Sequence, residues 1–126
     1  MDRQLSLLIV DDDPLILRLL SLMMSIDGFT IHTSTSGAEA MLLLKDQQVD
    51  ILLTDYSMPK MNGMELIRET RKTHPNLIIY MMTAYSTEFV SRYGSEEGIQ
   101  KVLTKPLNLD ALRSLLSSTN DSTRLA

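Results

Sequence analysis

The stretch LLIVDDDP, residues 7–14, determines how the rest of the chain is interpreted. Four apolar residues are followed at once by three aspartates, Asp11, Asp12 and Asp13. A short apolar run that ends in charge is typical of a buried parallel strand. Pro14 is favoured at the first position of a helix, so the acids are expected on the turn from strand to helix.

Adjacent carboxylates repel one another, which costs energy unless a cation or a base lies among them. A hard divalent cation such as Mg²⁺, which takes oxygen ligands, is the candidate that this turn suggests. In open α/β sheets, ligands bind outside the carboxyl ends of the strands, where this turn is expected. The alternative is structural, with one aspartate capping the helix and the others solvated. This stretch alone leaves both interpretations open.

The composition indicates one globular domain and excludes several other classes. The chain has 126 residues, 44% hydrophobic and 22% charged, with a formal net charge of -4 and a sequence pI of about 5.0. An acidic balance argues against a nucleic-acid-binding surface, and the absence of cysteine excludes disulfides and thiolate metal sites. The start shows no signal-peptide pattern, and the longest apolar stretch, 15–26, is too short to span a membrane. We therefore expect a soluble cytoplasmic domain without membrane contact.

Apolar runs alternate with helical patterns five times along the chain. The predicted strands are 7–10, 29–33, 49–54, 77–82 and 101–103, and the predicted helices are 14–25, 37–45, 64–73, 86–97 and 109–116. This alternation predicts a doubly wound, five-stranded parallel sheet with helices on both faces. The first helix is apolar around most of its circumference, so we expect most of it to be buried. Residues 1–119 are expected to form the domain, and 120–126 a flexible tail or the start of a linker.

Polar residues are predicted at the carboxyl ends of four strands: Asp11-Asp12, Asp55, Thr83 and Lys105. Each one alone is weak evidence, because a Thr at a strand end is usually a turn residue and a Lys before Pro is usually solvated. Together they point to one crevice, because this fold converges the strand ends there. Asp55 could act as a carboxylate nucleophile and form an aspartyl phosphate. Lys105 and a bound Mg²⁺ would neutralise the phosphoryl oxygens, and the Thr83 hydroxyl could hydrogen-bond one of them.

From about residue 7 to residue 116, the chain resembles the receiver domain of two-component response regulators. The motifs that carry the resemblance are VDDDP at 10–14, DYSMPKMNG at 55–63, TA at 83–84 and TKP at 104–106. The resemblance implies a flavodoxin-like sheet with strand order 2-1-3-4-5. It also implies a Mg²⁺-dependent switch that takes a phosphoryl group from the phosphohistidine of a sensor histidine kinase or a phosphotransfer protein.

The resemblance implies a role for each acid of the site. Asp55 matches the phosphoacceptor and is also a metal ligand. Asp12 matches the direct Mg²⁺ ligand, and Asp11 matches the acid that reaches the metal through water. The backbone carbonyl of Ser57 matches a further ligand. Asp13 matches an acidic position that is not usually a ligand.

The remaining family positions concern the phosphoryl group and the output. Thr83 and Lys105 match the residues that contact the phosphoryl group, and the bond before Pro106 resembles the family's cis peptide. Tyr85 matches a position at the mouth of the pocket, where an aromatic ring could block the hydrolytic water. The family usually has Tyr or Phe as a rotameric switch where this chain has Val102. Valine is stiff and short, so we expect little side-chain gating at this position.

Phosphorylation is expected to change interactions of the surface formed by the fourth helix, the fifth strand and the fifth helix. Gly94 should weaken the fourth helix by about 1 kcal/mol relative to Ala. We therefore expect the main response to be ordering or shifting of residues 86–98. Dimerisation on phosphorylation and an effector domain or protein downstream are further expectations.

Three alternatives belong to other classes. A pseudo-receiver would serve only for docking, but the acid, Thr and Lys set is complete. A Mg²⁺-dependent phosphohydrolase that resembles the haloacid dehalogenase family needs a second Asp two residues after the nucleophile, where this chain has Ser57. Flavin binding would need a Ser, Thr or Gly phosphate loop after the first strand, where this chain has three acids. We therefore expect a phosphoacceptor rather than a turnover enzyme.

Overall fold

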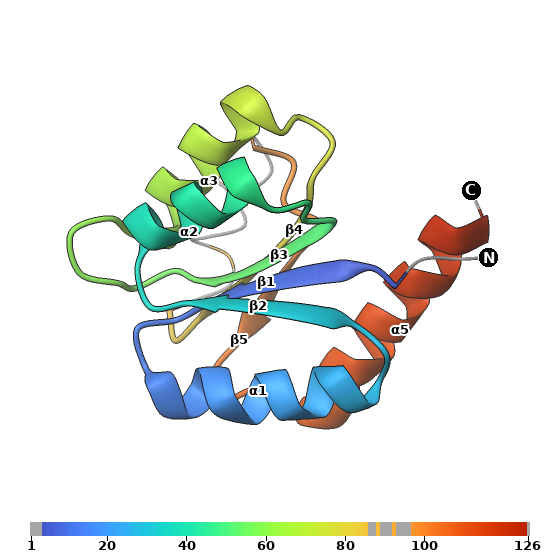
Figure 1. The fold of residues 1–126 in the computed structure, drawn as a ribbon. Coiled ribbons are helices and arrows are strands. Elements are labelled where there is room, and N and C mark those ends of the chain that lie inside the picture. Colours follow the sequence, from blue (N-terminus) through green and yellow to red (C-terminus); the bar gives the residue numbers. More distant parts are fainter. Residues whose placement is uncertain (1–3, 86–87, 89–91, 93–96, 126) are drawn as a thin grey trace.

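The computed structural model describes residues 4–85, 88, 92 and 97–125, and these form one sheet with helices on both faces (Figure 1). The elements are β1 (Ser6–Val10), α1 (Pro14–Ile26), β2 (Thr30–Ser34), α2 (Gly37–Asp46), β3 (Ile51–Asp55), α3 (Gly63–Thr73), β4 (Ile78–Thr83), β5 (Lys101–Thr104) and α5 (Leu109–Leu125). All neighbouring strands pair in parallel, in the order β2-β1-β3-β4-β5. The predicted fold class and strand order are confirmed. Most of the predicted 86–97 helix lies outside the described residues.

Two apolar clusters, one on each face, hold the sheet between its helices. Alternate residues of a strand point to opposite faces. In β1, Leu7 and Ile9 therefore join the cluster under α1 and α5, whereas Leu8 and Val10 join the cluster under α2 and α3. Strands buried on both faces must be apolar throughout, which explains the continuous apolar runs in the sequence.

Side-chain caps fix where the helices begin. The Asp13 carboxylate accepts a hydrogen bond from the Leu15 amide at 2.9 Å and caps α1, with Pro14 as its first residue. Asn62 and Glu65 form a reciprocal capping box at the start of α3. Each cap satisfies amides that have no partner within the helix. The helices therefore start close to the carboxyl ends of the strands that precede them.

The prediction that most of α1 is buried is wrong. Leu17, Leu20 and Met24 pack against the sheet, but four other large apolar residues face solvent. These are Leu15, Leu19, Leu22 and Ile26, with 75%, 48%, 67% and 77% of their surface exposed. A helix with apolar residues on both sides can bury only one side against a single sheet face. We call these four residues the α1 stripe.

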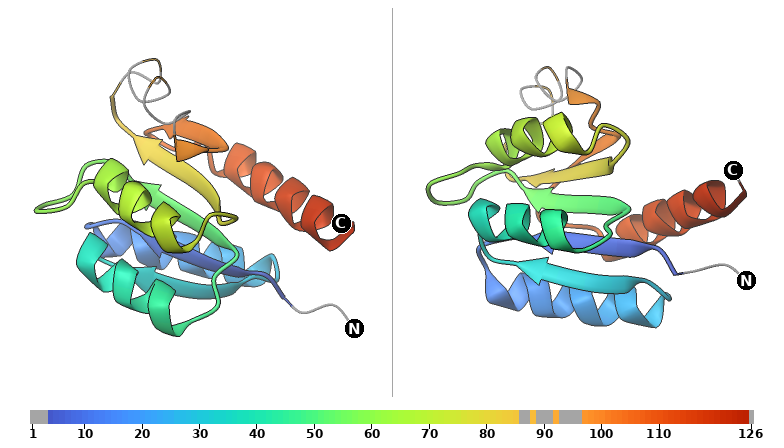
Figure 2. Two further views of the ribbon diagram at one scale, coloured as in Figure 1. Left: turned by 90° about the horizontal axis from the view of Figure 1, so that it is seen from above. Right: turned by 45° about the horizontal axis from the view of Figure 1, so that its top comes forward.

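Helix α5 is longer than predicted, because it continues to Leu125 instead of ending near residue 116. The Tyr80 hydroxyl forms a hydrogen bond with the Thr119 hydroxyl, which links this part of α5 to β4. The Thr119 hydroxyl also donates to the carbonyl of Leu115 at 2.8 Å. The tertiary contact with Tyr80 stabilises a Ser- and Thr-rich segment that has weak helix propensity of its own. The C-terminal end of α5 and the start of β1 lie at the same end of the molecule (Figure 2).

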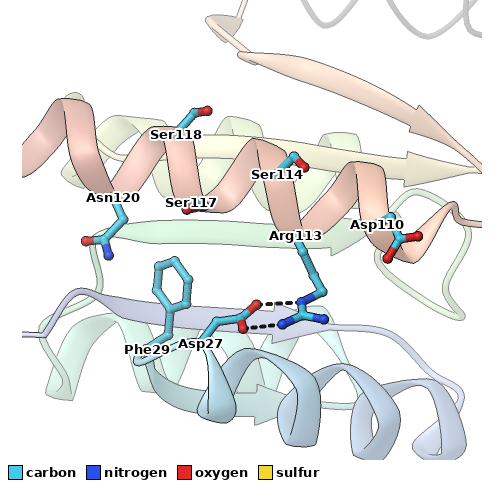
Figure 3. Close-up of a pocket in the computed structure, with 8 residues that line it drawn as sticks. All are labelled: Asp27, Phe29, Asp110, Arg113, Ser114, Ser117, Ser118 and Asn120. Carbon is cyan, nitrogen blue, oxygen red and sulfur yellow. Dashed lines mark hydrogen bonds and ion pairs between the residues drawn. The ribbon is translucent and has the colours of Figure 1, made fainter.

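An ion pair joins α5 to the end of α1. Arg113 donates to both carboxylate oxygens of Asp27, at 2.7 and 2.9 Å (Figure 3). This hydrogen bonding holds the pKa of Asp27 below its ordinary value. A groove of about 590 Å³ lies beside the pair, between Phe29 and the polar face of α5. It opens at the amino ends of the strands, away from the acidic turn after β1.

We predict that Gly63→Ala destabilises the fold, because an added Cβ would lie 2.4 Å from the backbone oxygen of Asp55. Backbone atoms cannot yield easily, so we expect the free energy of unfolding to fall by about 1–3 kcal/mol. Gly37→Ala is the matched control, since Gly37 is also the first residue of a helix. Its added Cβ would meet the sulfur of Met61 at 2.6 Å, which a flexible side chain can relieve. Urea denaturation of both variants measures the difference, and equal losses would contradict this account.

Candidate functional site

The carboxyl ends of four neighbouring strands bring the predicted site residues together. Asp11 directly follows β1, and Asp55 is the last residue of β3. Thr83 is the last residue of β4, and Lys105 directly follows β5. Because β1, β3, β4 and β5 are consecutive in the sheet, these residues share one edge.

Lys105 forms ion pairs with two buried carboxylates. Its ammonium nitrogen lies 3.0 Å from Asp11 Oδ2 and 3.3 Å from Asp55 Oδ1. Asp11 is fully buried, and Asp55 is 5% exposed. A buried carboxylate is costly unless it is paired and hydrogen-bonded. One ammonium therefore compensates two acids, and negative charge remains in excess.

This excess charge shifts two pKa values. Burial raises the pKa of Asp55, and the negative charge of Asp11 raises it further. Lys105 and a hydrogen bond from the Ser57 backbone amide lower that pKa only in part. Burial alone would lower the pKa of Lys105, but its hydrogen bonds and charge interactions with the two acids raise it above its ordinary value. Lys105 is therefore a cation at neutral pH, and ionisation of Asp55 is opposed by its surroundings.

Three of the predicted metal ligands lie close enough to share one ion. Asp11, Asp12 and Asp55 each offer a carboxylate oxygen, and these oxygens lie within 4.8 Å of one another. Oxygen ligands with unneutralised negative charge suit Mg²⁺. Asp13 is not part of this group because its carboxylate caps α1. The acidic turn thus combines both initial interpretations, since one aspartate is a cap and two belong to the cluster.

The other predicted site residues lie around this cluster. Thr83 is 1% exposed, and its hydroxyl oxygen accepts a hydrogen bond from the Tyr85 amide at 3.0 Å. The bond between Lys105 and Pro106 is cis, as the resemblance to receiver domains implied. Val102 is half-buried and packs against the cluster under α2 and α3. Ser57 is exposed, and the role of its carbonyl as a metal ligand stays a prediction.

Sequence reasoning missed one residue beside the site. The Tyr56 ring meets the Tyr85 ring edge to face, with centroids 5.7 Å apart and planes at 89°. Tyr56 was noted only as part of the motif after Asp55. The available signal was an aromatic residue just beyond each of two strand ends expected to be neighbours.

Comparison with known proteins identifies the family. The family model described as "Response regulator receiver domain" matches residues 7–117. The chain belongs to this family. The receiver domain is similar to the transcriptional regulatory protein CpxR of Klebsiella pneumoniae subsp. pneumoniae, with 39% identity over 102 residues, and to GlrR of Escherichia coli, with 37% identity over 106 residues. It is also 34% identical over 123 residues to the sensor protein EvgS of Escherichia coli.

The receiver domain corresponds to only part of each of these relatives. The matches cover 81%, 84% and 98% of this chain but 43% of CpxR, 24% of GlrR and 10% of EvgS. Receiver domains thus occur in both transcriptional regulators and sensors. The similarity lies within the receiver domain and does not extend to the rest of each relative.

Solved receiver structures match nearly the whole chain. The response regulator TrrA from Thermotoga maritima, solved in complex with Mg²⁺-BeF, has 30% identity and a TM-score of 0.82, covering 91% of this chain and 98% of that one. The chemotaxis response regulator CheY4 of Vibrio cholerae has 26% identity and a TM-score of 0.85, with the same coverage. Among the helices that the structure describes, none is both long and apolar enough to cross a membrane.

We predict that Asp55→Asn stabilises the receiver domain in metal-free buffer at pH 7. The folded state raises the pKa of Asp55, so above the unfolded-state value of about 3.8 the folded state holds this proton more tightly. The penalty for ionising Asp55 therefore develops as pH rises from about 3.8 through the folded-state pKa, and it persists above it. Asparagine cannot ionise and escapes this penalty.

Thermal unfolding of both proteins at several pH values measures this effect. The melting temperature of Asp55→Asn should exceed that of the wild type at pH 7, and the two should converge below the unfolded-state pKa. Mg²⁺ should raise the wild-type melting temperature and narrow the gap at pH 7, because it neutralises the same carboxylates. A variant that is less stable than the wild type at pH 7 without metal would contradict this electrostatic account.

Proposed function

We propose that this receiver domain is a signalling switch that accepts a phosphoryl group on Asp55. The observation that carries the proposal is the Asp55 carboxylate at the end of β3, 3.3 Å from the Lys105 ammonium and grouped with Asp11 and Asp12. A carboxylate nucleophile beside fixed positive charge and metal-binding oxygens suits phosphoryl transfer.

In the proposed reaction, one oxygen of Asp55 attacks the phosphorus of the donor. With phosphohistidine as donor, the P–N bond breaks, the imidazole leaves with the electron pair, and a P–O bond to Asp55 forms. Lys105 offsets negative charge on Asp55 before the attack and on the phosphoryl oxygens after it. The Thr83 hydroxyl donates a hydrogen bond to one of those oxygens. Mg²⁺, held by Asp11, Asp12, Asp55 and the Ser57 carbonyl, would add positive charge for the phosphoryl oxygens.

The α1 stripe supports docking of the phosphodonor protein on α1. Leu15, Leu19, Leu22 and Ile26 recur at spacings of four, three and four residues, which is the spacing of a seam that packs against another helix. Contiguous exposed apolar residues mark interaction sites in soluble proteins. The stripe also begins two residues after Asp13, so a helical partner there would lie beside the acidic cluster. We propose that this partner is a sensor histidine kinase or a phosphotransfer protein.

Downstream steps are proposed from the relatives. GlrR and CpxR are named as transcriptional regulatory proteins, so we propose that phosphorylation controls an effector domain or protein in the cytoplasm. We propose residues 1–119 as the receiver unit, with 120–126 as a tail or the start of a linker. Dimerisation on phosphorylation is part of the same proposal. We do not propose direct nucleic-acid binding by this domain, because the chain is acidic.

A docking-only pseudo-receiver and a phosphohydrolase fit the site less well. A docking module has no need for two buried carboxylates around a lysine, which cost stability when the charges are imperfectly balanced. A hydrolase of the dehalogenase type needs an acid at position 57, and Ser57 cannot supply a proton at neutral pH. We therefore favour a phosphoacceptor whose own pocket catalyses its phosphorylation and dephosphorylation.

The central experiment treats the protein with acetyl phosphate and measures its intact mass. We expect one phosphoryl adduct when Mg²⁺ is present and none when EDTA replaces it. Asp55→Asn should abolish the adduct because the amide oxygen is a poor nucleophile. Since Asp55→Asn is predicted to remain folded, its loss of adduct would reflect chemistry. An adduct that persists in this variant would overturn the assignment of Asp55.

The docking proposal is tested with Leu22→Glu, which places a charge in the α1 stripe. We expect phosphotransfer from a protein phosphodonor to fall about tenfold or more, as for loss of a central apolar contact worth at least 1.4 kcal/mol. Acetyl phosphate should still phosphorylate the variant at the wild-type rate, because Asp55 is untouched. Leu42→Glu is the matched control, since Leu42 is 65% exposed on α2 and outside the stripe. If both variants slow protein phosphotransfer equally, α1 is not the docking surface.

A further inference from the structure

Two tyrosines form a contact across the ends of β3 and β4 that the phosphotransfer chemistry does not use. Tyr56 directly follows Asp55, and Tyr85 lies two residues after Thr83. Their rings meet edge to face, with centroids 5.7 Å apart. The contact therefore joins the residue beside the nucleophile to the segment beyond the predicted phosphoryl-binding hydroxyl.

Tyr56 is the fixed member of this pair. Its amide donates to the Met82 carbonyl at 2.8 Å, which extends the pairing of β3 with β4 by one residue. Its carbonyl accepts from the Gly63 amide at 2.7 Å, at the first residue of α3. Its half-buried ring packs against the apolar cluster under α2 and α3. Backbone and ring are thus both held by the rest of the domain.

Tyr85 is held much more lightly. Its side chain is 56% exposed, and it lies beyond the last residue of β4. Within the described part of the chain, two interactions position it: the edge-to-face contact with Tyr56 and the hydrogen bond from its amide to the Thr83 hydroxyl oxygen at 3.0 Å. A change at Thr83 therefore acts directly on Tyr85.

The Thr83 hydroxyl connects this pair to the chemistry at Asp55. A hydroxyl has one proton to donate, and the direction of its bonds follows the side-chain rotamer. Threonine is β-branched, so it changes between discrete rotamers rather than bending gradually. A change of Thr83 rotamer toward a phosphoryl oxygen on Asp55 would turn its oxygen away from the Tyr85 amide. Residues 84–85 would then shift, because that amide would lose its partner.

We propose that the Tyr56–Tyr85 contact is a coupling element that breaks when Asp55 is phosphorylated and so changes the surface beyond β4. The proposal rests on the proposed function, and it assigns Tyr56 as the positioning residue that holds Tyr85 in the unphosphorylated state. It also accounts for output in a chain whose position 102 is a half-buried valine. Val102 has no ring that could rotate between a buried and an exposed position. In this proposal, Tyr56 stays fixed at the end of β3 while Tyr85 is released at the end of β4, and this release changes the surface.

The test follows the tyrosines by ¹⁹F NMR after incorporation of 3-fluorotyrosine. The chain has four tyrosines, so Tyr→Phe variants assign each resonance. We expect Mg²⁺ with beryllofluoride, a mimic of the phosphoryl group, to shift the Tyr85 resonance toward that of a freely exposed ring. Tyr80 is the internal control, because it is 5% exposed and packs in the cluster under α1 and α5. Its resonance should shift much less.

Two variants separate the coupling role of Tyr56 from a merely structural one. In Tyr56→Leu, the Tyr85 resonance should already lie near the activated position, and most of its response to Mg²⁺ and beryllofluoride should be lost. Tyr56→Phe keeps the ring and should keep the response. If Tyr56→Leu responds as fully as the wild type, the coupling proposal is wrong.

The acetyl phosphate adduct, measured on the same wild-type sample, separates failure of this inference from failure of the proposed function. If the adduct forms on Asp55 but the Tyr85 resonance does not move, the coupling proposal is overturned and the phosphoacceptor stands. If no adduct forms, the proposed function fails and the coupling proposal fails with it.

Discussion

The ion pairing of Lys105 with two buried carboxylates is the constraint on which the rest of the structure depends. Lys105 and Asp11 are 94 residues apart in the chain and meet only because β1 and β5 belong to one sheet. The strands between them, β3 and β4, contribute Asp55 and Thr83 to the same edge. A change in strand order would leave at least one buried acid without its cation, at a cost of several kcal/mol. The fold and the charge balance therefore specify each other.

The charges in the site do not balance, because the single positive charge of Lys105 faces the two carboxylates of Asp11 and Asp55. The remaining negative charge opposes ionisation of Asp55, as its raised pKa shows. Carboxylate oxygens in such surroundings suit a further cation, which in the proposed function would offset the added charge of a phosphoryl group. The apo site is thus less stable than a neutral one would be. Functional sites commonly reduce the stability of a fold. Here the apolar clusters on both faces of the sheet offset the cost of the unbalanced buried charge.

The sequence predicted the parts of this protein that depend on local pattern. Apolar runs located the strands, and Pro14 marked the start of the first helix. Polar residues at successive strand ends located the site, because parallel strands converge them. The predictions that failed depend on tertiary packing, which a local sequence pattern does not encode. Periodicity cannot show which side of a doubly apolar helix packs inward, so the exposure of the α1 stripe was missed.

Tertiary contacts decided the other two differences. The hydrogen bond between Tyr80 and Thr119 extends α5 through residues with weak helix propensity, and nothing near Thr119 in the sequence indicates it. The contact between Tyr56 and Tyr85 depends on the exact positions of two strand ends. A correct strand order makes these residues neighbours, but only coordinates show that their rings meet.

The proposed docking surface on α1 and the proposed Tyr56–Tyr85 coupling lie toward different faces of the sheet. Helices α1 and α5 cover one face of the sheet, and α2 and α3 cover the other (Figure 1). The α1 stripe belongs to the first side, whereas Tyr56 packs against the cluster under α2 and α3. Both reach the same carboxyl edge, one beside Asp13 and the other beside Asp55. A donor docked on α1 would therefore leave the Tyr85 side free to respond. An aromatic contact of this kind is worth about 0.5–1.5 kcal/mol, and 1.4 kcal/mol corresponds to a tenfold change in an equilibrium. Loss of this one contact is thus large enough to change the population of a surface state, yet small enough for the hydrogen bond of a single threonine to control it.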